Sequence, residues 1–425
     1  MINDSDIKIS VIGLGYVGLP MAVLFASRYQ VLGFDLNPAR VEELGRGVDS
    51  TLEVGPDRLA NAIGHGLRFT TDKAQLKNCN VFIVAVPTPV DVNNRPDLTP
   101  LLEASSTVGQ ALGHGKVVIY ESTVYPGVTE EECVPMLERT SGLRFNDDFF
   151  VGYSPERINP GDREHTVERI VKVTSGSTPE TADFVDRLYR SVLQCGTHRA
   201  PSIRVAEASK IVENTQRDVN IAFFNELAKV FNAMGIDTHD VIEAASTKWN
   251  FIKLSPGLVG GHCIGVDPYY LIQKAQVYGV LPRIMSDSRR LNDGMGYYVA
   301  TQVIRHMCLK GVRVKDARIL ILGFTFKENC PDIRNTKVLD IITTLGEYTS
   351  NLTVVDPWAD PAKTKREYGI NIVPQVETNM QFDAAILAVA HSAFANLPLR
   401  QMVPEPGVIY DVKGFLPRHI TDSRL

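Results

Sequence analysis

Short runs of β-branched and aliphatic residues alternate with helix-like stretches at both ends of the chain, and this alternation restricts the possible folds most. In such a pattern each helix connects two parallel strands, so that helices cover both faces of the sheet. We therefore expect an α/β fold with two doubly wound domains. The strand-like runs are Ile7–Ile12, Val31–Phe34, Val81–Val86, Lys116–Tyr120, Phe149–Tyr153 and Ile170–Thr174 near the N-terminus, and Arg318–Leu322, Leu352–Val355, Ala384–Val389 and Val408–Asp411 near the C-terminus.

The middle of the chain is helical in pattern. From Ile203 to Gly235 no proline or other glycine occurs, and apolar residues recur at helical spacing. This predicts one helix of roughly 30 residues, ~45 Å long at 1.5 Å per residue. Helices this long usually span two domains or form an oligomer contact. Further helices are expected at Asp237–Ser246, Asp267–Lys274 and Ser286–Lys310.

The expected architecture is thus two Rossmann-like α/β domains joined by a long central helix and a helical middle domain. We place the boundaries at residues 1–200, 201–312 and 313–425. The apolar stripe on the long helix predicts a homodimer through the central domain, with a higher assembly left open.

Composition excludes several classes of protein. A formal charge of −5 argues against a nucleic-acid partner. No apolar run is long enough to insert into a membrane, and the polar start of the chain is unlike a signal peptide. Six scattered cysteines, with no C-x-x-C pair, fit neither a disulfide framework nor a zinc site, so no metal is expected. These features favour a reducing, cytoplasmic location.

A glycine-rich turn follows the first strand-like run. Gly13, Gly15 and Gly18 form G-x-G-x-x-G, and a helical pattern begins there. The first glycine allows a tight turn, the second lets a pyrophosphate approach the backbone, and the third allows close packing of helix and strand. Backbone N–H groups at the helix start, around Tyr16 and Val17, would face the phosphates.

An acid at the end of the second strand-like run supports a dinucleotide site. Asp35 lies about 20 residues beyond the glycines, where a carboxylate binds ribose hydroxyls and repels a 2′-phosphate. This predicts NAD rather than NADP. Arg40 offers a phosphate contact, and the loop containing Pro87 and Thr88 offers a second cofactor contact. The alternative interpretation of Asp35 is an acid that only caps a turn. The alternative for the loop containing Pro87 is a turn that the prolines only stiffen.

The stretch from Gly260 to Asp267 reads GGHCIGVD and suggests a reactive thiol. Most isolated cysteines are small core residues. Cys263, however, follows two glycines and directly precedes a helical pattern, and a helix N-terminus favours the thiolate. Such a thiol can capture an aldehyde as a thiohemiacetal, which is oxidised to a thioester and hydrolysed to an acid.

With these motifs and five others, the chain resembles the UDP-glucose/GDP-mannose dehydrogenase family over nearly its whole length. The other motifs are Glu121–Val124, Ser154–Glu156 and the pair Lys210 and Asn214, followed by Gly323–Lys327 and Asp332–Arg334. The resemblance implies an enzyme with an NAD-binding first domain, a dimer-forming central helix and a nucleotide-binding last domain. It oxidises a CH₂OH group of a nucleotide sugar to a carboxylate with two NAD and one water.

The resemblance also assigns site residues. Cys263 corresponds to the nucleophile and Asp267 to a base or water-orienting acid. Lys210 and Asn214, one helical turn apart, correspond to an oxyanion and water site. Thr123 corresponds to a position that handles proton transfer and contacts the cofactor. The remaining positions that the resemblance assigns to the substrate are Glu156, which also handles the hydrolytic water, Arg157, Phe251, Gly260, Phe326 and Lys327.

Departures from the family pattern suggest the substrate branch. Arg157 and Pro160 stand where an aromatic residue and a second acid are common, and the loop Phe251–Val259 is a residue longer than in UDP-glucose enzymes. The sequence around Cys263 is similar to that of the branch that acts on UDP-N-acetylhexosamines for bacterial surface polysaccharides such as capsule or O-antigen. We therefore expect UDP-GlcNAc or UDP-GalNAc, whose configuration the sequence does not distinguish.

Other functions remain open at this point. The same reaction on UDP-glucose, UDP-ManNAc or GDP-mannose is one alternative. A single-step NAD-dependent hydroxyacid dehydrogenase is another, although it needs no cysteine and lacks a second α/β domain. A nucleotide-sugar sensor without activity is a third.

Overall fold

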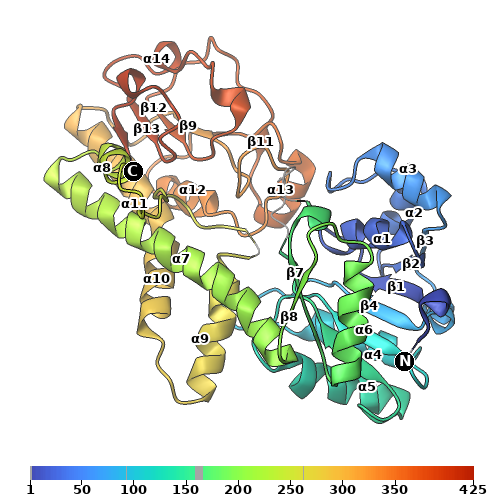
Figure 1. Cartoon of the computed structure of the whole chain (residues 1–425). Helices are drawn as coiled ribbons and strands as arrows, with labels where there is room; N and C mark the ends of the chain where they lie inside the picture. The colour runs from blue at the N-terminus through green and yellow to red at the C-terminus, as the bar shows by residue number, and fades with distance from the viewer. Residues whose placement is uncertain (1, 92, 158–165, 262) are drawn as a thin grey trace. The chain divides into compact units, whose positions relative to one another are not determined.

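The computed structural model describes residues 2–91, 93–157, 166–261 and 263–425 and confirms the α/β fold. The chain divides into two compact units. Unit 1 comprises Met1–Glu213 and Tyr269–Gly279, and unit 2 comprises Asn214–Pro268 and Val280–Leu425. Each unit contains one of the two sheets (Figure 1).

The sheet of unit 1 has the strand order β3-β2-β1-β4-β5-β6-β7-β8. The first six strands in this order run parallel, as expected from the alternating pattern. The sequence did not reveal the two short strands β3 and β8. The strands are β1 (Lys8–Ile12), β2 (Gln30–Phe34), β3 (Arg68–Thr70), β4 (Val81–Val84), β5 (Val117–Tyr120), β6 (Phe150–Tyr153), β7 (Lys172–Gly176) and β8 (Thr197–Arg199).

Strand β7 runs antiparallel to β6, with Tyr153 opposite Ser175, which departs from the parallel pattern. Its first residue, Lys172, consequently lies beside the carboxyl end of β6. A parallel strand would begin at the opposite edge of the sheet. The carboxyl edge of an open α/β sheet is where ligands bind, so this reversal brings an extra side chain to that edge.

Helices cover both faces of the unit 1 sheet. Alternate residues of β1 and β4 enter two different cores: Val11 and Ile83 pack with α1, α3 and α6, whereas Ile12 and Phe82 pack with α4 and α5. This two-residue period is what a strand requires when both its faces are buried. The helices are α1 (Gly18–Ala26), α2 (Pro38–Gly45), α3 (Pro56–Gly64), α4 (Thr99–Gly109), α5 (Val134–Ser141) and α6 (Pro179–Arg190).

The expected long helix is α7, which has 32 residues from Ile203 to Met234 and ends at Gly235, whose φ is +71° (Figure 1). Two other helices also match their patterns, α8 (Thr238–Ala245) and α9 (Asp267–Val277). The single helix predicted for Ser286–Lys310 is wrong. Two helices, α10 (Arg283–Asp293) and α11 (Met295–Leu309), meet at Gly294, since glycine stabilises a continuous helix poorly.

Unit 2 contains a six-stranded parallel sheet with the order β11-β10-β9-β12-β13-β14. Its six strands follow the same winding order as the first six strands of unit 1. Helices α11 and α12 cover one face and α14 the other. The elements are β9 (Ile319–Leu322), α12 (Val338–Gly346), β10 (Leu352–Val355), α13 (Pro361–Tyr368), β11 (Ile372–Val373), β12 (Ala384–Leu387), α14 (Leu399–Met402), β13 (Val408–Asp411) and β14 (Ser423–Arg424).

The first turn of the two sheets is built alike. Gly13 N donates to Phe34 O at 2.8 Å, and Gly323 N donates to Val355 O at the same distance. Both glycines have positive φ, +90° and +95°. The two α/β parts therefore repeat one structural plan, as the alternating pattern at the two ends suggested.

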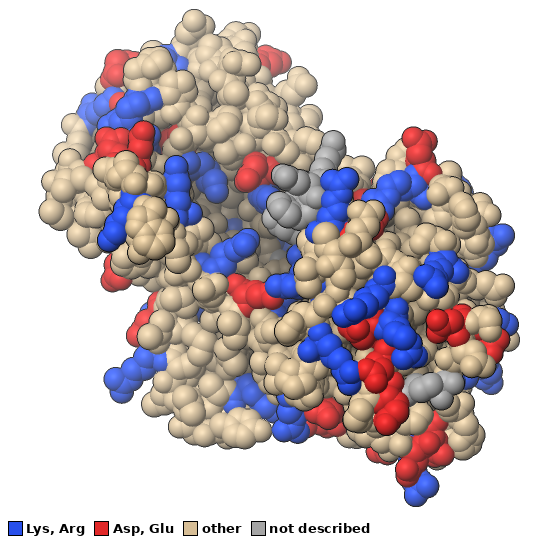
Figure 2. Space-filling view, in the orientation of Figure 1, with Lys and Arg blue, Asp and Glu red and all other residues tan. Residues whose placement is uncertain are grey.

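Charge is distributed over the surface without a strongly basic region on the face that Figure 2 shows, where cationic and anionic side chains are interspersed. Among the described residues, no helix combines the length and apolar character needed to cross a membrane.

Candidate active site

The glycine-rich turn leaves the backbone at Gly15 accessible to a ligand. A Cβ on Gly13 would lie 2.8 Å from Ala85 O, and a Cβ on Gly18 would lie 1.8 Å from Gly13 O, so neither position accommodates a side chain. Gly15 is exposed and has nothing within 4 Å of its Cβ position. The turn, in which Tyr16 and Val17 are partly buried just before α1, thus fits the close approach of a pyrophosphate.

Asp35 lies at the carboxyl end of β2 beside this turn. Its carboxylate accepts hydrogen bonds from Leu14 N and Asn37 N, each at 2.9 Å, and the side chain is partly exposed. A carboxylate can accept about four hydrogen bonds, so capacity remains for ribose hydroxyls. The acid both caps a turn and faces the position that a dinucleotide would occupy.

Arg40 is buried, and its guanidinium has protein partners. Nη2 pairs with Asp49 at 2.8 Å, Nη1 pairs with Glu43 at 2.8 Å, and Nε donates to Leu14 O at 3.0 Å. The sequence suggested a phosphate contact for this residue. In the structure the guanidinium instead supports the backbone of the glycine turn.

Two further loops leave the same edge of the sheet and are held together. Thr88 Oγ1 donates to Thr123 O at 2.7 Å, and Ser122 Oγ donates to Val86 O at 2.7 Å. Tyr270 of α9 donates from its hydroxyl to Thr88 O at 2.8 Å. The predicted cofactor residues Thr88 and Thr123 are therefore neighbours. Pro87 is exposed beside them.

Glu156 follows β6 and is 5% exposed. Lys172 Nζ donates to Glu156 Oε2 at 3.0 Å and to Glu121 Oε2 at 2.9 Å. Glu121 also accepts a hydrogen bond from the Tyr189 hydroxyl. We refer to Glu121, Lys172 and Glu156 as the buried charge triad. Sequence reasoning missed Lys172, which lies between Val171 and Val173 without a motif around it.

Electrostatics in the triad are dominated by burial. Burial raises the pKa of Glu121 to about 7, against the lowering effect of Lys172 and with a further increase from Glu156. Burial alone would lower the pKa of Lys172, but the two carboxylates outweigh it and raise that pKa. Lys172 therefore remains a cation, whereas Glu121 titrates near neutral pH.

Arg157 extends away from this triad. It is exposed, and its guanidinium makes two contacts with Glu213 of α7, at 2.7 and 3.2 Å. Pro160, which stands where the family commonly has a second acid, lies outside the described residues, as does His262.

Cys263 lies in the turn that opens α9. Its carbonyl accepts hydrogen bonds from Val266 N at 3.0 Å and Asp267 N at 2.8 Å, and the residue is partly exposed. Asp267 is 2% exposed and accepts a hydrogen bond from Asn214 Nδ2. Two of the predicted catalytic residues are thus in contact within unit 2. Lys210, one turn before Asn214 on α7, belongs to unit 1 and is 6% exposed.

The loop before Cys263 is anchored by an asparagine that sequence reasoning missed. Asn225 of α7 donates from Nδ2 to Gly257 O at 3.0 Å and accepts from Gly257 N at 2.8 Å. The same amide also donates to Asn292 Oδ1 at 2.8 Å. Farther back in the loop, Phe251 packs edge-to-face on Phe224, with ring centroids 6.1 Å apart. Both contacts tie the loop to the long helix.

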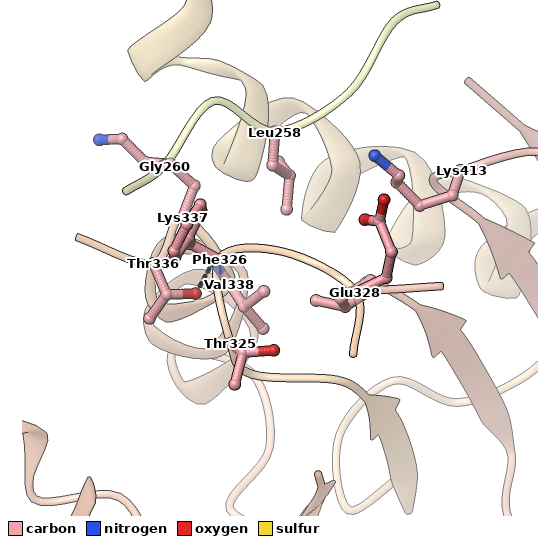
Figure 3. A pocket seen from close by; sticks show the side chains of 11 residues that line it. Leu258, Gly260, Thr325, Phe326, Glu328, Thr336, Lys337, Val338 and Lys413 are labelled. Atoms are coloured by element: carbon pink, nitrogen blue, oxygen red, sulfur yellow. Dashed lines mark hydrogen bonds between the residues drawn. The ribbon is translucent and has the colours of Figure 1, made fainter. Parts of the chain in front are cut away.

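A pocket lies where this loop meets the first turn of the second sheet (Figure 3). A Cβ on Gly261 would lie 2.9 Å from the ring of Phe326, so the glycine allows the aromatic side chain to pack against the backbone. Lys327 follows Phe326 and is partly exposed. The pocket is lined by Leu258, Gly260, Thr325, Phe326, Glu328, Thr336, Lys337, Val338, Ala388, Val389 and Lys413.

Within the described ranges, no group of three His, Cys, Asp or Glu side chains is arranged to hold a metal ion. Cys195 and Cys308 are exposed free cysteines.

Comparisons with known proteins identify the family. Three domain models of the UDP-glucose/GDP-mannose dehydrogenase family match in succession: the NAD binding domain over residues 7–193, the central domain over 204–294 and the UDP binding domain over 320–418.

Similar proteins span the full length of the chain. The UDP-N-acetyl-D-glucosamine 6-dehydrogenase of Pseudomonas aeruginosa is 56% identical over 99% of this chain and 100% of its own length. The enzyme of the same name from Salmonella typhi is 52% identical over 100% of both chains. The structure of UDP-D-ManNAc dehydrogenase from Pyrococcus horikoshii is 29% identical, with a TM-score of 0.88 over 98% of both chains. The chain therefore belongs to the UDP-glucose/GDP-mannose dehydrogenase family and is an NAD-dependent nucleotide-sugar dehydrogenase.

Proposed function

We propose that the chain oxidises the C6 alcohol of UDP-N-acetylglucosamine to the carboxylate. The main support is the identity of 56% and 52%, over essentially full length, to two enzymes named for this substrate. The similarity of the loop around Cys263 to the N-acetylhexosamine branch supports the same substrate. UDP-GalNAc, UDP-glucose, UDP-ManNAc and GDP-mannose are the alternative substrates.

We assign the steps to the residues as follows. NAD, when bound at the glycine turn and Asp35, accepts a hydride in each of the two oxidations. We assign the first proton transfer to Thr123, which follows β5, and Glu156, which follows β6. The Cys263 thiolate then adds to the aldehyde carbon and forms a thiohemiacetal. Its oxidation leaves a thioester on Cys263.

Hydrolysis completes the reaction. Lys210 and Asn214 donate hydrogen bonds to the oxyanion that forms as water attacks the thioester. Asp267, held by Asn214, orients the water, and Glu156 accepts its proton. The C–S bond breaks, which releases the uronic acid and returns the thiol. We assign Phe326 and Lys327, with Phe251, Gly260 and Arg157, to binding of the nucleotide sugar.

The stoichiometry of NADH tests this function. With limiting UDP-GlcNAc and excess NAD, absorbance at 340 nm should report two NADH for each sugar consumed, because both oxidations occur at one site. One NADH per sugar would support a single-step dehydrogenase, and none a sensor. The same assay with UDP-GalNAc, UDP-glucose, UDP-ManNAc and GDP-mannose should give a kcat/KM at least about tenfold lower, since each differs from UDP-GlcNAc in its sugar or its base, and a site selective for one set of hydrogen-bonding groups discriminates against the others.

We also propose a homodimer formed through α7. Phe223, Val230 and Met234 are 55%, 47% and 63% exposed, and at 100° per residue they fall within about 40° of one another on the helix. An exposed apolar stripe of this kind is typical of a protein interface. Light scattering at micromolar concentration should give twice the chain mass. Phe223→Glu should shift the mass toward the monomer, whereas Tyr348→Glu, an exposed aromatic on another helix end, should not. A monomeric wild type would exclude this assembly.

Unpaired, exposed Cys195 and Cys308 are consistent with a reducing compartment, and we propose that the reaction takes place in the cytoplasm. Its product would serve synthesis of a bacterial surface polysaccharide, capsule or O-antigen.

A further inference from the structure

The buried charge triad contains two groups that the reaction scheme leaves unused. Lys172 and the Glu121 carboxylate are 0% exposed, whereas Glu156, which the scheme uses, is 6% exposed at its side chain. Glu156 is therefore the member of the triad that reaches the surface. Burying a cation and two carboxylates is unfavourable unless the charges pair with and hydrogen-bond to one another. The arrangement therefore needs an explanation.

Three separate strands converge to build the triad. Glu121 follows β5, Glu156 follows β6, and Lys172 begins β7, which reaches this edge only because it runs antiparallel. Lys172 Nζ also donates to Pro155 O at 3.1 Å, which fixes the backbone just before Glu156. Glu156 Oε1 in turn accepts a hydrogen bond from Arg157 N at 2.6 Å. Both oxygens of the Glu156 carboxylate are thus oriented by protein donors.

Two titratable side chains near the triad, Tyr189 and Arg157, have partners other than Glu156. Tyr189 of α6 donates its hydroxyl proton to Glu121, and its ring centroid lies 5.6 Å from Lys172 Nζ. The Arg157 guanidinium pairs with Glu213 of α7 and not with Glu156. Lys172 is thus a cation in direct contact with the Glu156 carboxylate, and Glu121 is an anion that shares it.

We propose that Lys172 is a positioning residue that holds the Glu156 carboxylate and, by sharing its charge with Glu121, sets the pH range of thioester hydrolysis. The inference rests on the proposed function. In the step concerned, water loses a proton to Glu156, the hydroxide oxygen bonds to the thioester carbon, and the C–S bond to Cys263 breaks. The cation of Lys172 favours the unprotonated Glu156 that this step requires, whereas Glu121 opposes it.

Two substitutions should move the reaction in opposite directions. Lys172→Met removes the cation and leaves two buried carboxyl groups, so Glu156 should hold its proton to higher pH. Glu121→Gln removes the competing carboxylate, so that Lys172 pairs with Glu156 alone. Glu156 should then lose its proton at lower pH. The acid limb of the hydrolysis rate should therefore move up by at least about one pH unit in Lys172→Met and move down in Glu121→Gln.

The covalent enzyme provides a readout that a purely structural role would not change. In Lys172→Met, slow hydrolysis should cause a burst of two NADH per active site, followed by a steady rate reduced about 100-fold, the scale of a lost general base. Intact mass should show the sugar attached to Cys263 during turnover, and the KM for UDP-GlcNAc should change by less than about threefold. Lys116→Met is the matched control, because Lys116 is a partly buried lysine at the opposite end of β5. It should show no burst and no pH shift.

The outcomes separate the inference from the proposed function. If the wild type forms no uronic acid from any of the sugars tested, the proposed function fails. Suppose that the wild type yields acid and two NADH. If Lys172→Met then accumulates no adduct and has the same pH profile as Lys116→Met, the role of Lys172 is refuted. If Lys172→Met does not fold, Glu121→Gln decides alone. A downward shift of its acid limb supports the inference, and an unchanged or upward-shifted limb contradicts it.

Discussion

Replacement of Cys263 by alanine is expected to lower steady-state formation of the uronic acid by at least about 1000-fold, because no other group forms the covalent intermediate. The residue lies at the turn that opens α9, where backbone N–H groups and the helix dipole favour a thiolate. Binding of NAD and of UDP-GlcNAc should change little, because neither depends on the sulfur. Calorimetric titration and product analysis measure the two effects separately.

The serine variant of the same residue should identify the intermediate. Serine can add to the aldehyde and form an ester, which hydrolyses more slowly than a thioester. Cys263→Ser should therefore accumulate a covalent sugar adduct that intact mass detects. Cys308→Ala is the matched control, since Cys308 is an exposed free cysteine of unit 2 and should be dispensable. Near-normal acid production by Cys263→Ala would rule out the covalent mechanism, although the family assignment would stand.

The fold was largely predictable because strands buried on both faces leave a strong sequence pattern. Ile9 and Val11 face one core and Ile12 faces the other, so apolar residues occur on both faces of β1, and all four residues of β4 are apolar. The direction of β7 was not predictable, since strand direction depends on its neighbour and not on its own residues. The break at Gly294 was missed because apolar residues continue on both sides of it and no proline marks the end of α10.

The site was predictable where a residue has an unusual local setting. Gly13, Gly15 and Gly18 follow a strand at a fixed spacing, and Cys263 follows a glycine pair. Lys172 has no such setting, because a lysine in a short strand usually faces solvent, and its two carboxylate partners come from segments 51 and 16 residues away. The partners of Arg40 were missed for a related reason, since its contact with Asp49 depends on how the loop after α2 folds back.

The second structural repeat contains an acid at the position equivalent to Asp35, but its environment is different. Asp356 follows β10 as Asp35 follows β2, and Phe324 N donates to Asp356 as Leu14 N donates to Asp35. Asp356 is 0% exposed. Its carboxylate also accepts hydrogen bonds from Thr325 N, Trp358 N, Ala359 N and His391 Nε2. No acceptor capacity remains for a ribose, so this acid is structural.

Asp356→Ala is therefore expected to destabilise unit 2 by at least about 3 kcal/mol, because it leaves four backbone N–H groups, three of them buried, and His391 without their acceptor. Asp35→Ala is the matched control. Asp35 accepts only two backbone hydrogen bonds and is partly exposed, so its loss should weaken NAD binding and lower stability by about 1 kcal/mol. Urea unfolding followed by far-UV circular dichroism reports both units, and fluorescence of Trp358 in a Trp249→Phe background reports unit 2, since these are the two tryptophans of the chain. Equal destabilisation by the two substitutions would contradict the structural role of Asp356.

The loss of stability in Asp356→Ala should depend on pH. Although burial opposes it, hydrogen bonds from His391 and the backbone N–H groups lower the pKa of Asp356 from 3.8 to about 2. A shift of this size corresponds to about 2 kcal/mol of stability. Because the folded-state pKa lies below the ordinary value, this contribution is complete above about pH 4 and is lost as the pH falls through about 2. The difference in unfolding free energy between the wild type and Asp356→Ala should therefore be constant from pH 7 to about pH 5 and narrow below pH 4. A difference that stays constant down to pH 3 would show that the carboxylate charge contributes nothing, and that Asp356 acts only as a neutral acceptor.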